Sequence, residues 1–94
     1  MVNTVVTVAT TNTLVLAAPK QTGQRSSLVI QNTGATNSVT ITFGNSAAVY
    51  GSGLVLPPWA GATLAQDFDA ALIDSAIQGI ATGGTTTVSL IYNA

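Results

Sequence analysis

Apolar and small polar residues alternate along most of this chain with a period of two. That period is typical of β-strands that bury one face, because successive side chains point to opposite sides of a strand. Turn-forming residues interrupt the alternation about every 8–12 residues, so that each interval holds about one short strand. This spacing indicates a sandwich or barrel. We therefore predict one all-β domain over residues 1–94, an antiparallel β-sandwich or jelly-roll-like barrel of about seven or eight short strands.

The parity of the apolar residues predicts which side of each strand is buried. In the first run, Val2, Thr4, Val6 and Val8 share one parity, and a second run has a short apolar ladder of Leu14 and Leu16. Further strands are expected at residues 27–31, 39–43, 54–56 and 62–64 and within the closing stretch 77–92.

Two β-hairpins are predicted from the turn residues between neighbouring runs. The first spans Arg25–Phe43, with the turn formers of residues 33–38 between its strands. The second closes the chain around Thr82–Thr85, because its two central glycines accept a positive φ. Pro57 and Pro58 cannot donate to a ladder, so they are expected at a strand end or sheet edge.

The stretch DFDAALI, residues 67–73, is the one place where a helical turn is expected, with Asp67 or Asp69 as its cap. We predict Phe43, Phe68 and Tyr92 to belong to the core.

Chain length and composition suggest that this domain associates with other chains. A domain of 94 residues buries a modest share of its surface, and small domains usually need disulfides, a metal or association. Cysteine and histidine are both absent from the sequence, which excludes disulfides, thiolate metal sites and the usual general base near neutral pH. Association is the remaining route to stability.

Charged residues make up 5% of the chain, and the formal net charge is −1. Binding to nucleic acid by neutralising phosphates is therefore not expected. No apolar run is long enough to cross a bilayer, and the N-terminus does not read as a signal peptide, so no membrane partner is expected and the chain should stay in the cytosol until assembly. The charged residues are Lys20, Arg25, Asp67, Asp69 and Asp74.

Catalysis is not expected of this chain, and no cofactor is predicted. Lys20 has no nucleophile motif around it, and the three aspartates do not form a calcium-binding loop. We interpret these acids as solvated or capping residues, with no catalytic or metal site.

A succession of motifs resembles that of small β-sandwich proteins of tailed-bacteriophage virions. It comprises R-x2-L-x-I-x-N from Arg25 to Asn32, a strand ending in Phe43-Gly44, then Leu56-Pro57, and A-I-x-G-I-A-x-G-G-T-x2-V-x-L from Ala76 to Leu90. The resemblance is to capsid decoration (cement) proteins and related head-fibre or tail domains. It implies a non-enzymatic virion component, commonly a trimer, that stands on the outside of the capsid lattice.

Six residues are candidates for an interface: Val2, Val6, Val8, Arg25, Tyr50 and Trp59. Residues 1–18 form either an edge strand of the domain or an arm exchanged with a neighbouring subunit. Arg25 either anchors another subunit or pairs with Asp67 or Asp69. Trp59 either plugs the end of the sandwich, contacts another subunit or stacks on a sugar ring, whereas Tyr50 is expected to be exposed on a loop.

These observations favour a structural virion protein that decorates and stabilises a phage capsid by binding the major capsid protein at symmetric sites. The alternative is a receptor- or glycan-binding module of a phage fibre or tail, with Tyr50 and Trp59 as its platform.

Overall fold

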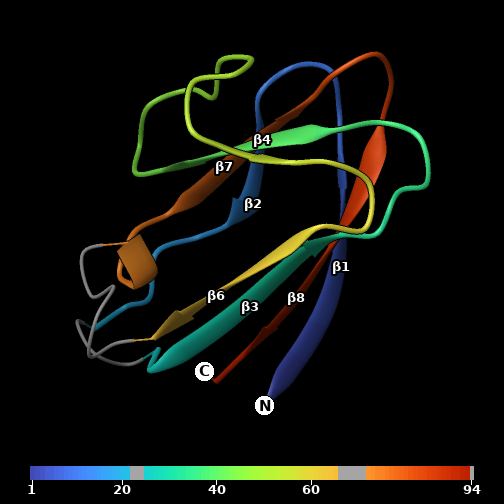
Figure 1. Cartoon of the computed structure of the whole chain (residues 1–94). Coiled ribbons are helices and arrows are strands. Elements are labelled where there is room, and N and C mark those ends of the chain that lie inside the picture. Colours follow the sequence, from blue (N-terminus) through green and yellow to red (C-terminus); the bar gives the residue numbers. More distant parts are fainter. Residues whose placement is uncertain (22–24, 66–71, 94) are drawn as a thin grey trace.

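Two antiparallel sheets of four strands each form the domain in the computed structural model, which describes residues 1–21, 25–65 and 72–93 (Figure 1). Sheet A has the strand order β1-β8-β3-β6, and sheet B has the order β2-β7-β4-β5. The strands are β1 (Val2–Val8), β2 (Thr13–Leu16), β3 (Ser27–Asn32), β4 (Val39–Phe43), β5 (Leu54–Leu56), β6 (Gly61–Ala65), β7 (Ile77–Ala81) and β8 (Thr86–Tyr92).

This strand order is that of a jelly roll, in which eight strands form two Greek keys around one core. Among the described strands, β4 and β5 are the only consecutive pair that are also neighbours in a sheet. Every other connection crosses from one sheet to the other. The predicted all-β sandwich is confirmed, and the strand order identifies the jelly-roll form of it.

Both predicted hairpins are wrong. Strand β3 pairs with β6 and β8 in sheet A, whereas β4 pairs with β5 and β7 in sheet B. Likewise, β7 and β8 lie in different sheets on either side of the Thr82–Thr85 turn. A glycine-rich turn reverses the chain in either arrangement, so turn chemistry does not distinguish a hairpin from a connection between sheets.

The core lies between the two sheets and contains the apolar residues of one parity from each strand. In β3 and β4 the predicted parity is confirmed, since Leu28, Ile30, Val39 and Ile41 are fully buried. In β2 the prediction is wrong for Leu14, which is exposed while Val15 faces the core, whereas Leu16 packs against the core as predicted. A register shift between Leu14 and Leu16 breaks the regular pairing of this strand with β7.

A long connection between β4 and β5, Gly44–Gly53, lies over the outer side of sheet B; we call it the strap (Figure 1). In the strap, the backbone amide of Gly51 donates to the hydroxyl of Thr40 (3.1 Å), and the carbonyl of Gly44 accepts from the side-chain amide of Gln78 (3.4 Å). These contacts explain why Thr40 and Gln78 are buried although they point away from the core.

The strap should depend on Gly53 more than on Gly51. Both have a positive φ, 151° and 74°, but a Cβ at Gly53 would press against the backbone carbonyl of Ile41, whereas a Cβ at Gly51 meets nothing. We expect Gly53→Ala to lower the free energy of unfolding by about 2 kcal/mol and Gly51→Ala by about 1 kcal/mol. Urea denaturation of the two variants tests this order, and equal losses would contradict it.

Strand β1 is paired within the chain, with β8, over its whole length from Val2↔Tyr92 to Val8↔Thr86. In this single chain, Val2–Val8 is therefore an edge strand of its own sheet, and exchange of residues 1–18 with a neighbouring subunit stays a prediction. The predicted helical turn at residues 67–73 lies mostly outside the described residues, although Leu72 and Ile73 are helical. Phe43 and Tyr92 pack against the core as predicted, whereas Phe68 lies outside the described residues.

Candidate interaction surfaces

The outer face of sheet A is uncharged, because none of its four strands contains a charged residue. Its outward positions alternate with the buried ones and align across the sheet through the registers of β1, β8, β3 and β6. They carry hydroxyls, amides and three aliphatic side chains. These outward residues are Asn3, Val5, Thr7, Ser27, Val29, Gln31, Gly61, Thr63, Thr87, Ser89 and Ile91.

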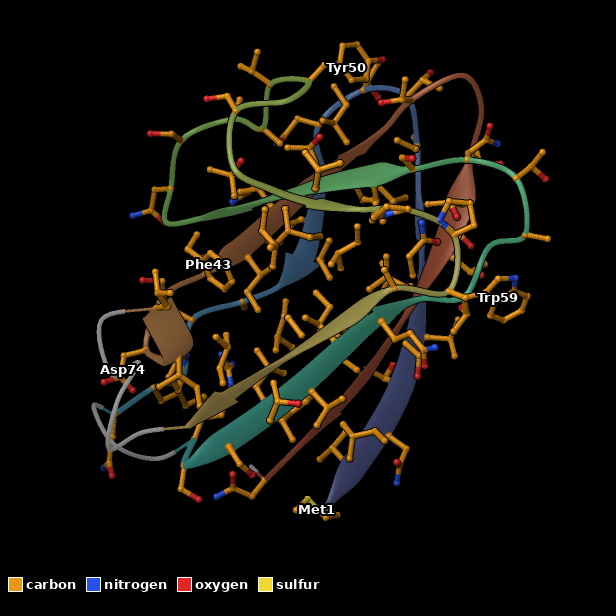
Figure 2. All side chains as sticks on the ribbon, viewed as in Figure 1. Met1, Phe43, Tyr50, Trp59 and Asp74 are labelled. Atoms are coloured by element: carbon orange, nitrogen blue, oxygen red, sulfur yellow. The ribbon has the colours of Figure 1, made fainter. Side chains whose placement is uncertain are left out.

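Trp59 lies beside this face, at the turn between β5 and β6 (Figure 2). The amide of Ala60 donates to the carbonyl of Pro57 (3.0 Å), which closes a four-residue turn with Pro58 and Trp59 at its centre. Trp59 has a φ of 67°, so it occupies the third position of a type II turn, where glycine or asparagine is usual. Its side chain is 60% exposed, and the prediction that it plugs the sandwich is therefore wrong.

The end of β3 holds this turn in place. The amide of Trp59 donates to the carbonyl of Asn32 (2.8 Å), and the amide of Asn32 donates to the carbonyl of Ala60 (2.9 Å). The side-chain amide of Gln31 donates to the carbonyl of Trp59 (3.0 Å). These bonds fix the backbone on both sides of a residue whose left-handed conformation costs about 1–3 kcal/mol.

Asn32 is fully buried and organises this end of the sandwich. Its Nδ2 donates to the carbonyls of Asn37 and Leu56, both at 2.9 Å. Its Oδ1 accepts from the amide of Gly34 (3.0 Å) and from the hydroxyl of Thr86 (2.8 Å). All four hydrogen-bonding positions of the amide are therefore used. Our sequence interpretation missed this role, although an asparagine two residues before a glycine is typical of a side chain that bonds its own backbone.

Tyr50 is exposed on the strap, as predicted, and its hydroxyl donates to the carbonyl of Thr10 (2.8 Å). Asn12 reinforces this link between the strap and the β1–β2 connection by accepting from the amide of Ala48 (2.7 Å). Figure 2 shows Tyr50 at the strap and Trp59 at a separate corner of the molecule. The two rings therefore do not form one platform, and that part of the glycan-binding alternative is wrong.

Arg25 lies inside the domain with 4% of its surface exposed, which contradicts its candidacy as an anchor onto another subunit. Its Nη1 donates to the carbonyl of Ile73 (3.0 Å) and its Nη2 to that of Ala17 (2.9 Å), while its guanidinium lies 5.3 Å from the centre of the Tyr92 ring. Burial lowers the pKa of Arg25 from its ordinary value, and the Coulombic interactions with Tyr92 and Asp74 act in the opposite direction. The expected partners Asp67 and Asp69 lie outside the described residues.

The three candidate valines of β1 face the inside of the sandwich. Val8 is fully buried, Val6 packs against the core, and Val2 is half-buried on the same side, so these residues do not present an exposed patch. The exposed valine of this strand is Val5, with 64% of its surface accessible. Val5 has the same parity as the polar residues Asn3 and Thr7, and this pattern could have predicted from the sequence that it faces outward.

Neither a metal cluster nor a membrane-spanning helix is found in residues 1–21, 25–65 and 72–93. These residues contain no group of three or more acidic, histidine or cysteine side chains that could hold a metal ion. In the same part of the chain, no helix is long and apolar enough to cross a membrane.

Comparison of the chain with protein-family models, with curated proteins and with solved structures finds no match. A functional proposal for this chain therefore depends on its fold and on its surfaces.

Proposed function

We propose that this chain is a structural protein of a tailed-phage virion that decorates the capsid and stabilises it by non-covalent binding at symmetric sites. The observation that supports this most is Trp59, exposed in a strained turn beside an uncharged sheet face. A strained residue persists where the surroundings over-determine it, and such residues are concentrated at binding sites. The jelly roll is a fold of viral capsid proteins, which supports the proposal by analogy.

Binding in this proposal depends on contact area. A standard interface takes about 800 Å² from each partner, which is about one sixth of the 4807 Å² that this chain exposes. The outer face of sheet A supplies hydroxyls, amides and aliphatic groups, and Trp59 supplies an aromatic anchor of the kind that dominates binding energy. Because the face carries no charge, its contacts should persist at high salt, where surface ion pairs are screened.

The copy number per particle tests this function directly. Quantitative mass spectrometry of purified virions should find hundreds of copies of the chain in each particle, and washing in 1 M salt (on the order of ten times physiological) should leave them bound. Absence of the chain from purified virions would contradict the proposal.

A receptor- or glycan-binding module of a fibre or tail is the second candidate. The exposed Trp59 ring, with the amide of Gln31 hydrogen-bonded to its backbone, supports this alternative, and lectins also use jelly rolls. A copy number of a dozen or fewer per virion would favour it over decoration.

Replacing Trp59 should separate stability from binding. Trp59→Gly removes the ring and relieves the positive φ, whereas Trp59→Ala removes the ring and keeps the strain. We expect the glycine variant to unfold with a free energy about 1 kcal/mol higher than that of the alanine variant. Both variants should bind stripped particles at least about tenfold more weakly than the original chain, as expected for the loss of a tryptophan hot spot. Unchanged binding by both would exclude Trp59 as an anchor.

A further inference from the structure

Strand β1 leaves one edge of sheet A without a neighbouring strand among the described residues. The backbone of an edge strand carries amide and carbonyl groups that another extended strand can pair with. We infer that two copies of this chain pair antiparallel through β1, about a two-fold axis at Val5. This contact goes beyond the proposed function and supplies the association that the length and composition of the chain predict.

The four sheet edges formed by the described strands differ in how well they are protected against such pairing. Strand β5 has three residues, β2 has four and an irregular register, and β6 has five and begins beside the Pro57–Ala60 turn. Strand β1 has seven residues, an uninterrupted register with β8, and no proline, charge or bulge. Short strands, bulges and charges are the usual means of preventing edge pairing, and β1 has none of them.

The sequence of β1 is nearly symmetric about its centre, which identifies a second copy as the occupant. With Val5 opposite Val5 of the partner subunit, Asn3 lies opposite the partner's Thr7, and Val2 opposite the partner's Val8. The outward residues thus meet outward residues, and the inward residues meet inward ones. A charge at position 5 would face its own copy across the two-fold axis and repel it, but β1 contains no charge there or elsewhere.

Pairing would also cover apolar surface that a single chain leaves accessible. Val5 is 64% exposed, and Val2 and Val6 are half-buried at the open edge of the sandwich. Two sheets joined at β1 would form one continuous sheet of eight strands across the pair. This is a self-complementary two-fold contact, so it predicts a dimer, whereas the resemblance to decoration proteins implies a trimer.

The absence of cysteine from the chain allows a direct test by disulfide trapping. Directly opposed residues of antiparallel strands have Cα atoms about 4.5–5.5 Å apart, within the range that a disulfide spans. In oxidising buffer at low concentration, Val5→Cys should therefore form covalent dimers at least about tenfold faster than two matched variants. These are Val29→Cys, which is exposed on the same face in the interior strand β3, and Val55→Cys, which is exposed on the short edge strand β5.

A charge pair provides the second measurement. Val5→Lys and Val5→Glu should each be monomeric by light scattering, and an equimolar mixture of the two should form a dimer. All of these positions are exposed, so the fold should be retained, which circular dichroism checks. Equal cross-linking rates for the three cysteine variants, or a monomer or trimer for the original chain, would overturn the inference. The particle copy number is measured separately, so failure here is distinguishable from failure of the proposed function.

Discussion

Replacing Asn32 with aspartate should destabilise the domain more than any other single change considered for it. The two carbonyls of Asn37 and Leu56 accept from the side-chain amide of Asn32, and a carboxylate has no proton to donate to them. Asn32→Asp would therefore bury a charge against two carbonyl oxygens, a change that costs about 3–5 kcal/mol. We expect denaturant unfolding to show a loss of this size or a chain that does not fold.

The matched control is Asn45→Asp, the same chemical change at an exposed position of the strap. It should alter the free energy of unfolding by no more than about 0.5 kcal/mol. Similar losses for the two variants would show that added negative charge, rather than the hydrogen bonds of Asn32, determines stability.

Arg25→Ala should produce the second large effect, a loss of about 3 kcal/mol in the free energy of unfolding. The substitution leaves the carbonyls of Ala17 and Ile73 without their charged donor, and hydrogen bonds to charged groups contribute about 1.5–3 kcal/mol each. It also removes the guanidinium from the Tyr92 ring. Arg25→Lys should recover only part of the loss. It keeps the charge, but an ammonium group lacks the planar fork that reaches two carbonyls.

Lys20→Ala serves as the control because it removes the same charge from an exposed residue of the same connection. We expect it to change stability by less than about 0.5 kcal/mol. A small effect of Arg25→Ala in the same urea titration would show that the bonds of Arg25 to Ala17, in the β2–β3 connection, and to Ile73, in the β6–β7 connection, do not stabilise the fold.

The strands of this protein are predictable from its sequence, but their pairing is not. Alternation shows that Leu28, Ile30, Val39 and Ile41 are buried, and the structure agrees. The same alternation says nothing about which sheet receives each strand. A sandwich buries the apolar face of every strand in the same core, so the predicted hairpin of residues 25–43 and the observed crossing satisfy the pattern equally well.

The candidate surfaces were predictable in part. The two prolines before Trp59 indicated a turn, but a tryptophan with a positive φ is disfavoured on its own and depends on bonds from Gln31 and Asn32. Those residues lie nearly thirty positions away in the chain, so only the fold brings them together. For Arg25 a carboxylate partner was predicted at Asp67 or Asp69, which lie outside the described residues. The hydrogen bonds that the structure shows go to backbone carbonyls, which no residue pattern specifies.

The position of β8 at the centre of sheet A has a consequence for biosynthesis. Strands β1 and β3 are made early and both pair with β8, which is the last of the described strands to be synthesised. Sheet A therefore stays incomplete on the ribosome until Tyr92 has emerged, and its apolar strands are exposed to chaperones and to other nascent chains until then. Such long-range pairing also belongs to the slow end of folding, on the order of milliseconds to seconds.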